Sequence, residues 1–196
     1  MGVTTDRRLF CLAAASLAAG AIGARPAGAD QIADLAAAVK ATYLHKFTPF
    51  VKWPGDAFAA PDSPYLLCVI GDSGFEDLVR RAVAGQVVGG RAFSVQASTS
   101  IEHASHCHVA YFGPTGFAPT AAVLEALRGR PVLTVTDSVV GGASGIVHFV
   151  LDGARVRFEI DARLAQMSGI EISSRVLELA LRVKRAGLDG AERTSS

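Results

Sequence analysis

Residues 141–180 read GGASGIVHFVLDGARVRFEIDARLAQMSGIEISSRVLELA, and this stretch decides the fold. Residues 145–151 are almost wholly apolar, as in a strand covered on both faces, and they run into Asp152-Gly153, a strong hairpin signal. Residues 155–160 then alternate apolar and charged side chains, which is typical of a strand with one face in water. The pattern predicts a C-terminal antiparallel hairpin whose second strand forms the edge of a sheet.

A helix is predicted after this hairpin. Ser173 and Ser174 offer side-chain oxygens that can cap its N-terminus. The apolar residues that follow recur on one helical face, opposite three charged residues. They are Val176, Leu177, Leu179, Ala180 and Val183, against Arg175, Glu178 and Arg182. We expect this helix to pack on the sheet.

Upstream, apolar strand patterns alternate with helical patterns. The predicted strands cover residues 65–70, 91–96, 108–112 and 131–136, and the helices between them begin near Phe75 and Thr120. Strands that alternate with helices indicate a mainly parallel sheet. The sequence therefore predicts an α/β fold: a Rossmann-like, mainly parallel sheet that ends in the antiparallel hairpin, with helices on both faces.

An amphipathic helix opens the domain. Its apolar residues recur at steps of three and four and are Ile32, Leu35, Ala36, Val39, Tyr43, Phe47 and Phe50. Pro49 bends or ends this helix before Trp53-Pro54. We interpret the helix mainly as core-facing. Its aromatic residues allow an alternative, a ligand cleft or a partner surface, because aromatic side chains are enriched at both.

The first 29 residues have the features of a cleaved export signal. Arg7 and Arg8 precede a run rich in Ala, Leu and Gly, and Ala27-Gly28-Ala29 is a small-residue cleavage site. The apolar run is short of the roughly 20 strongly apolar residues that a membrane anchor needs. The arginine pair also resembles a twin-arginine signal, although Asp6 replaces the usual Ser or Thr. We predict a domain over residues 30–183 and a frayed tail over 184–196.

The charge balance argues against nucleic acid as a partner. The chain has 19 Lys and Arg and 18 Asp and Glu residues, and the predicted signal removes three arginines and one aspartate. The mature chain therefore has a net charge near zero, without a basic excess. Two cysteines remain after processing, Cys68 and Cys107. An even number in an exported protein favours a disulfide over the alternative of two buried thiols.

Two motifs suggest chemistry but lack the context that the chemistry needs. The letters GDSG at residues 71–74 match the nucleophile loop of trypsin-like proteases, but Phe75-Glu76 follows and the fold is not all-β. A tight turn with a capping box of Ser73 and Glu76 explains the same residues. We therefore predict no catalytic residues and no enzyme.

Three histidines, His103, His106 and His108, surround Cys107 and resemble metal ligands. A structural site needs four ligands, and no second cluster supplies the others. We interpret them as hydrogen-bonded or solvated histidines, and we predict neither a metal nor a cofactor. His148, in an apolar strand, is expected to be hydrogen-bonded on a buried face.

Four segments resemble a known family. They are GGASGIVHFVLDGARVRFEI with SGIEISSRVLELA, the helix end YLHKFTPFVKWP, the strand LLCVIGD and the strand start CHVAYF. Taken in their order along the chain, they resemble the YfiR-like family of bacterial periplasmic proteins over residues 40–183. The resemblance implies that Cys68 pairs with Cys107, because the family's cysteines fall on these positions. Some relatives have a further close-spaced cysteine pair near residues 141–149, which this chain lacks.

The resemblance also implies a function. The best-known members are periplasmic repressors that hold the sensor part of an inner-membrane diguanylate cyclase inactive, which lowers cyclic-di-GMP and affects biofilm formation. By this resemblance, the chain is a periplasmic regulatory protein without direct membrane insertion, and a homodimer is compatible with it. Aromatic anchors and an open edge strand are common docking elements. The predicted partner-binding residues are accordingly Phe47, Phe50, Trp53, Arg155 and Arg157.

Two other functions remain open from the sequence. A periplasmic small-molecule-binding protein would have its pocket at the carboxyl ends of the strands, near residues 71–74 and 113–116. An accessory protein of a sensor kinase would use the same kind of docking surface as a cyclase repressor.

Overall fold

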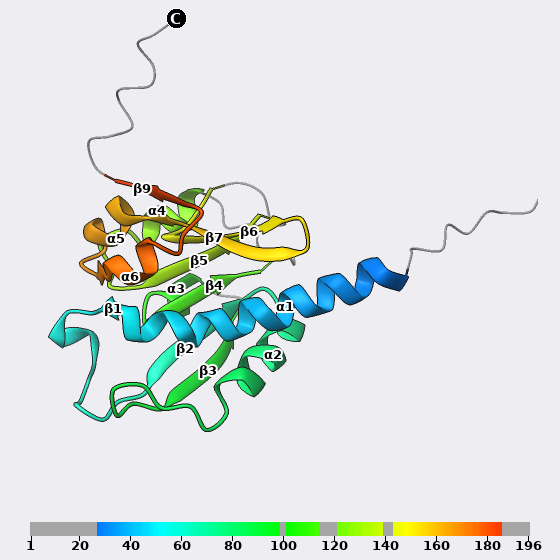
Figure 1. The fold of residues 1–196 in the computed structure, drawn as a ribbon. Coiled ribbons are helices and arrows are strands. Elements are labelled where there is room, and N and C mark those ends of the chain that lie inside the picture. Colours follow the sequence, from blue (N-terminus) through cyan, green and yellow to red (C-terminus); the bar gives the residue numbers. More distant parts are fainter. Residues whose placement is uncertain (1–26, 99–100, 114–120, 139–142, 186–196) are drawn as a thin grey trace, which may run out of the picture.

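The computed structural model describes residues 27–98, 101–113, 121–138 and 143–185 (Figure 1). Nearly all of the predicted signal segment and most of the predicted tail lie outside these residues. Residues 114–116, which belong to one predicted pocket loop, also lie outside them.

A seven-stranded sheet forms the centre of the molecule. Its strand order is β3-β2-β4-β5-β6-β7-β9, and the pairs from β3 to β6 are all parallel. The strands β6 and β7 form the antiparallel hairpin. The bounds are β2 (Tyr65–Ile70), β3 (Phe93–Ser98), β4 (Val109–Phe112), β5 (Leu133–Asp137), β6 (Val147–Asp152), β7 (Arg155–Asp161) and β9 (Arg182–Lys184). The predicted α/β class, parallel sheet and hairpin are confirmed.

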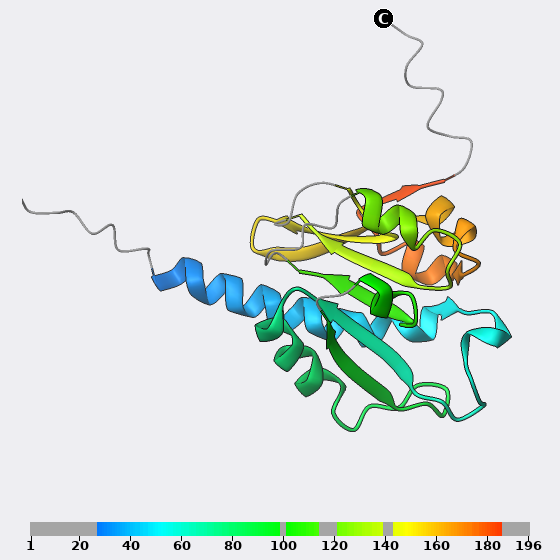
Figure 2. The ribbon, with the colours of Figure 1, turned by 180° about the vertical axis from the view of Figure 1, so that it is seen from behind.

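Helices cover both faces of the sheet. The helices α1 (Ala27–Phe47) and α2 (Ser73–Val83) pack on one face, and α3 (Ile101–Ala104) and α4 (Ala121–Ala126) on the other (Figures 1 and 2). Successive side chains of a strand point to opposite faces. In β2, Leu67 and Val69 therefore join the core under α1 and α2, whereas Cys68 and Ile70 join the core under α3 and α4.

Short elements complete the fold near the carboxyl end of α1. Two 3-10 helices follow α1, η1 (Thr48–Phe50) and η2 (Gly55–Ala57). A small antiparallel pair joins β1 (Val51–Lys52) to β8 (Glu171–Ile172). The remaining helices are α5 (Ala162–Met167) and α6 (Ser174–Leu177).

The structure corrects the prediction for residues 173–183. Only four residues form the helix α6, and the chain then becomes the strand β9. The backbone N–H of Leu181 donates to the carbonyl of Phe158 at 2.8 Å, and Val183 pairs with Ile160. The unpaired backbone groups on the outer side of β7 explain this ending, because an added strand satisfies them. The edge of the sheet is therefore β9 and not β7.

The apolar stripe of α1 is only partly buried. Ile32 is 48% exposed and Leu35 is 65% exposed, whereas Ala36, Ala41 and Leu44 belong to the core. The first turns of α1 project beyond the sheet in both ribbon views, so none of the strands that the structure describes lies beneath them (Figures 1 and 2). The prediction of a core-facing helix was therefore wrong for its amino-terminal half.

The cap of α2 also differs from the predicted capping box. Asp72 is the N-cap residue, and its carboxylate accepts a hydrogen bond from the N–H of Phe75 at 2.9 Å. Ser73 is already in the first turn, and Glu76 forms an ion pair with Arg80. A carboxylate is a good cap because it also interacts favourably with the helix dipole.

One disulfide links strand β2 to the segment that enters β4, on the face of the sheet that α3 and α4 cover. Cys68 in β2 is bonded to Cys107, which lies two residues before β4, and their Cα atoms lie 6.0 Å apart. Both residues are buried. The link therefore joins β2 to the segment that leads into its neighbour β4.

Candidate docking groove

A groove lies between the carboxyl half of α1, strand β7 and helix α6. Its volume is about 480 Å³. It is lined by Tyr43, Lys46, Phe47, Phe50, Val156, Arg157, Phe158, Val176 and Leu179. Three of the five predicted partner-binding residues, Phe47, Phe50 and Arg157, thus meet in one depression. We call it the α1–β7 groove.

The floor of the groove is a packed aromatic cluster. The rings of Phe47 and Phe158 meet edge to face at 5.1 Å, and Tyr43 lies 5.7 Å from each of them. Phe47 and Phe158 are buried, and Tyr43 and Phe50 are partly buried. Because these rings hold one another in place, the floor needs little reordering when a partner binds.

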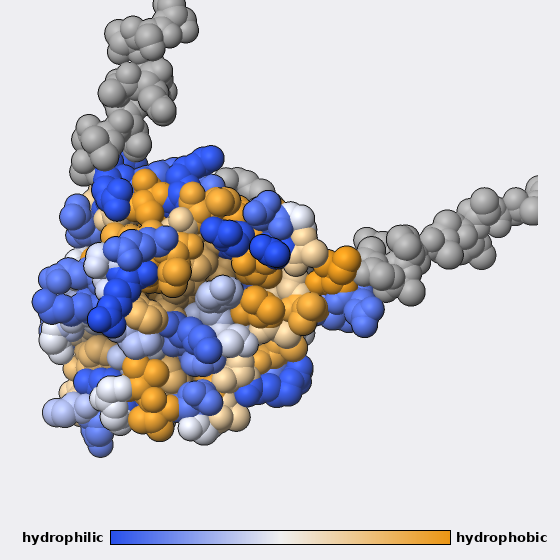
Figure 3. Space-filling view, in the orientation of Figure 1, coloured by the Kyte–Doolittle hydropathy of each residue, from blue (hydrophilic) through white to orange (hydrophobic). Residues whose placement is uncertain are grey.

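The rim carries apolar and cationic side chains. Leu179 is 64% exposed, although it follows the buried Val176 by only three residues. Among the described residues that line the groove, the charged ones are Lys46 and Arg157, and both are cations. Figure 3 shows hydrophobic surface on the face that carries α1, with hydrophilic residues around it. The groove therefore suits an apolar side chain flanked by carboxylates.

The apolar surface continues along α1. A second shallow depression of about 430 Å³ is lined by Ala38, Val39 and Thr42, and it shares Tyr43 and Lys46 with the groove. Beyond it lie the exposed side chains of Ile32 and Leu35. Monomeric soluble proteins seldom expose long apolar surfaces without a role in binding.

The other two predicted partner-binding residues lie outside the groove. Trp53 is only 8% exposed, and its ring packs against Tyr65, Phe58 and His108. Arg155 is exposed at the start of β7, where it pairs with Asp152 across the hairpin. Trp53 is therefore a core residue. This agrees with the interpretation that the aromatic residues near the end of α1 pack mainly in the core.

A buried polar cluster holds α1, which forms one side of the groove, against the sheet. Lys40 of α1 donates to a carboxylate oxygen of Asp137 at 2.5 Å, and the hydroxyl of Tyr111 donates to the same oxygen at 3.3 Å. Burial, together with the negative charges of Asp137 and Asp72, raises the pKa of Tyr111 well above its ordinary value, so the hydroxyl remains a donor. The cluster thus connects α1 to the carboxyl ends of β4 and β5.

Of the histidines near the disulfide, His108 is hydrogen-bonded in the interior and the other two are exposed. The N–H of Leu66 donates to Nδ1 of His108 at 3.0 Å, so the ring proton is on Nε2, which donates to the carbonyl of Ala57. His103 and His106 are exposed. Among the described residues, no three His, Cys, Asp or Glu side chains lie close enough together to hold a metal ion.

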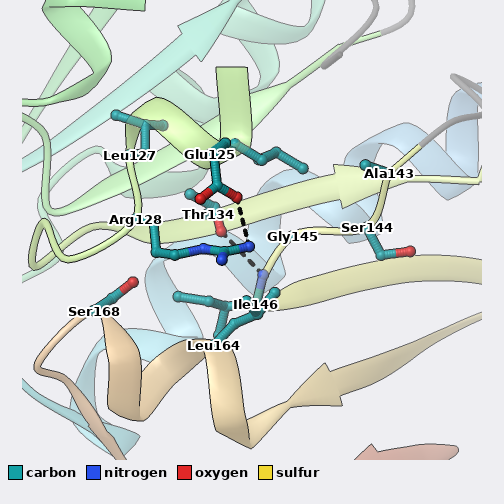
Figure 4. A pocket seen from close by; sticks show the side chains of 11 residues that line it. Glu125, Leu127, Arg128, Thr134, Ala143, Ser144, Gly145, Ile146, Leu164 and Ser168 are labelled. Atoms are coloured by element: carbon teal, nitrogen blue, oxygen red, sulfur yellow. Dashed lines mark hydrogen bonds and ion pairs between the residues drawn. The ribbon is translucent and has the colours of Figure 1, made fainter. Parts of the chain in front are cut away.

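A small pocket is relevant to the alternative function, the binding of a small molecule (Figure 4). It has a volume of about 140 Å³ and lies at the amino ends of β5 and β6, next to α4 and α5. Several of its polar groups already have partners. Arg128 pairs with Glu125 at 2.6 Å, and Thr134 accepts from the N–H of Ile146 at 3.0 Å. At the opposite, carboxyl ends, Asp72 fills the space beside Gly113, where an added Cβ would meet the Cβ of Asp72 at 2.5 Å.

Sequence reasoning missed several groove residues. Lys46 lies between the aromatic residues Tyr43 and Phe47 of α1. The sequence places Leu179 on the buried face of a helix that ends earlier in the structure. The helical spacing of Tyr43, Phe47 and Phe50 was the one signal available, and it indicates a shared face without saying whether that face is covered.

The fold and the groove define an α/β domain with a disulfide-tied, mainly parallel sheet and a preformed apolar groove on one face. The profile of the YfiR/HmsC-like family matches residues 37–181, and the chain belongs to this family. This match confirms the family resemblance of the four sequence segments. Membership supports a periplasmic regulator of diguanylate cyclases in general terms, within a regulatory and non-enzymatic family. Among the helices that the structure describes, none is long and apolar enough to cross a membrane.

Proposed function

We propose that this protein represses an inner-membrane diguanylate cyclase by binding the cyclase's periplasmic sensor domain in the α1–β7 groove. The observation that carries the proposal is the groove itself, a rigid aromatic floor with an exposed leucine and two cations at its rim. The family match supports the kind of receptor. Export to the periplasm, by a signal within residues 1–29, is part of the proposal.

Repression requires a difference in affinity. A binding protein shifts a receptor only as far as it prefers the inactive conformation to the active one. Moving a receptor from almost fully active to almost fully inactive needs a preference of about 10⁴-fold. The sensor surface that enters the groove must therefore be accessible mainly in the inactive state.

The groove also indicates how the affinity arises. A chain of near-zero net charge gains little from long-range steering, so the apolar contacts supply most of the binding energy. Phe50 and Leu179 are the groove residues best placed to contact a partner, because they reach the surface. Lys46 and Arg157 would then select a partner with carboxylates beside its apolar anchor.

The test is a complementation experiment with a matched control. Deletion of the gene should raise cyclic-di-GMP and surface attachment, and exported wild-type protein should reverse both. Leu179→Glu places a charge in the groove and should abolish this reversal, whereas Met167→Glu, at an exposed residue of α5 outside the groove, should restore repression. Equal activity of the two variants would contradict docking in the groove.

The two alternative functions give different results. If deletion leaves the cyclic-di-GMP concentration unchanged and cross-linking in envelope membranes recovers a sensor kinase, then the kinase and not the cyclase is the receptor. Unchanged cyclic-di-GMP, with a metabolite retained by the purified protein, would favour the small-molecule-binding function.

A further inference from the structure

We infer that residues 54–64 form a pH-sensitive strap, which His108 holds over the amino ends of β2, β3 and β4 at neutral pH and releases in acid. The strap has the sequence PGDAFAAPDSP and connects β1 to β2, in cyan in Figure 1. The inference does not rest on the proposed receptor, because no strap residue lines the α1–β7 groove.

Two side chains attach the strap to the sheet. Nε2 of His108, which lies one residue before β4, donates to the carbonyl of Ala57 at 3.0 Å. Nη1 of Arg91, which lies two residues before β3, donates to the carbonyls of Ala60 and Ser63 at 3.0 and 2.6 Å. Among the described residues, no other hydrogen bond joins the strap to the rest of the molecule. A segment with so few attachments can open while the sheet stays folded.

The large apolar side chain of the strap, Phe58, packs on the same two residues. Its ring stacks on the ring of His108, with centroids 4.2 Å apart, and the guanidinium carbon of Arg91 lies 3.8 Å from its centroid. The ring of Phe58 also lies 6.4 Å from that of Trp53 and 5.4 Å from that of Tyr65. His108 therefore holds the strap both by a hydrogen bond and by a stacked ring.

The surroundings of His108 fit the ring only in its neutral form. Nδ1 accepts a hydrogen bond from the N–H of Leu66 at 3.0 Å. A proton on Nδ1 would face this N–H, because an imidazolium ring has donors at both nitrogens. The charged ring must therefore turn away from Leu66. Its bond to Ala57 and its stack on Phe58 are then lost.

The groups around the ring do not offset the added charge. Arg91 is a cation, and Tyr65 of β2 presents its aromatic ring at 5.8 Å. The other titratable groups of the neighbouring segments are exposed to water. They are Lys52, Asp56, Asp62, His103, His106 and Arg130.

The sign of the pH dependence follows from these surroundings. Burial lowers the pKa of His108, its bond to Ala57 opposes this shift, and Arg91 adds to it. The ring has its ordinary pKa of about 6.5 once the strap is open and the ring is in water. The open form therefore binds the proton more tightly than the closed form does, so acid favours opening.

Opening would uncover an aromatic surface. Trp53 and Tyr65 are each 8% exposed, and Phe58 packs against both of them. Release of Phe58 would open these two rings to contact from outside. The strap thus acts as a cover that acid removes from an apolar surface.

Hydrogen exchange of the wild-type chain tests the strap without a substitution. The amides of Ala57, Ala60 and Ser63 are hydrogen-bonded within the strap, so their exchange reports its opening. After correction for intrinsic rates, their exchange should rise about tenfold per pH unit below about pH 6.5, until the pKa of the closed form is reached. The amides of β2 and β4 should stay protected. No rise in the strap, or an equal rise in the strands, would overturn the inference.

Two histidine variants identify the group that titrates. The side chain of His108→Gln can accept from Leu66 and donate to Ala57 but takes up no proton, so its strap should stay closed down to pH 5. His106→Gln is the matched control, because His106 is exposed two residues away, and it should behave as the wild type.

Tryptophan fluorescence gives a second measurement on the same variants. Trp53 is the only tryptophan in the sequence, and its ring lies 6.1 Å from that of His108. Its emission should shift to longer wavelengths in acid for the wild type and His106→Gln, with unchanged far-ultraviolet circular dichroism. An equal shift in His108→Gln would contradict a strap that His108 controls.

Discussion

At the scale of single residues, the buried pair of Lys40 and Asp137 is central to the fold. The two side chains are 7% and 2% exposed, and they lie 97 residues apart in the sequence. An ion pair in this environment contributes little net stability over an apolar pair of similar shape. Loss of one partner is costly, because the other charge then stays buried without its counter-ion.

The pair gives a prediction about stability. Lys40→Met should lower the free energy of unfolding by about 3–5 kcal/mol, because Asp137 keeps its burial and loses its cation. Lys40→Met with Asp137→Leu should recover a large part of this loss. Urea unfolding of the three proteins measures both effects. A double variant as unstable as the single one would show that the charge of Asp137 is not the cause.

His108 makes stability depend on pH. Burial, and secondarily the cation Arg91, lowers the pKa of His108 below its ordinary value of 6.5, while its bond to Ala57 opposes the shift. The unfolded chain therefore takes up a proton at a higher pH than the folded chain does. The stabilisation is complete above about pH 6.5 and is lost as the pH falls through the folded pKa.

This pH dependence can be measured by urea unfolding between pH 7.5 and pH 5. The free energy of unfolding should fall with acidification, because protonation removes the acceptor that Nδ1 offers to the N–H of Leu66. His108→Gln cannot titrate and should show a shallower slope. Burial lowers the pKa of His45 and His148 as well, so a smaller slope should remain in the variant. An unchanged slope would exclude His108 as a source.

At the scale of elements, sequence patterns predicted the interior of a helix or strand correctly, but they predicted its ends less well. Alternation in residues 155–160 and the turn at Asp152-Gly153 were sufficient to predict the hairpin. The prediction of a helix from Ser173 to Val183 was wrong, because its last residues form a strand. A strand of three residues is too short to show a period of two in the sequence. Its pairing with β7 is a tertiary contact and decided the outcome.

The cap of α2 provides a prediction at this scale. Asp72→Ala should lower the free energy of unfolding by about 1 kcal/mol, because the N–H of Phe75 loses its acceptor. Ser73→Ala is the matched control and should change stability very little, since Ser73 is exposed in the first turn. Thermal unfolding of both variants distinguishes this cap from the capping box expected from the sequence. A larger loss for Ser73→Ala would restore the original assignment.

At the scale of the whole molecule, the disulfide limits the freedom of the unfolded chain. Cys68 and Cys107 are separated by 39 residues, and closing such a loop stabilises the fold by about 4 kcal/mol on the chain-entropy model. Reduction should therefore lower the melting temperature substantially, without changing the far-ultraviolet circular dichroism of the folded state. The variant Cys68→Ala with Cys107→Ala serves as the control and should show no further effect of reductant.

The sequence by itself determined the class of fold, the order of strands along the chain, the hairpin and the presence of a cysteine pair. These features follow from patterns of two to about ten neighbouring residues, whose periodicity and turn chemistry act locally. The tertiary structure alone decided that Leu35 and Leu179 are exposed, that Lys40 meets Asp137, and that residues 182–184 extend the sheet. Each of these depends on which surfaces and backbone edges are left without a partner once the sheet has formed. That is a property of elements far apart in sequence, so no local pattern could contain it.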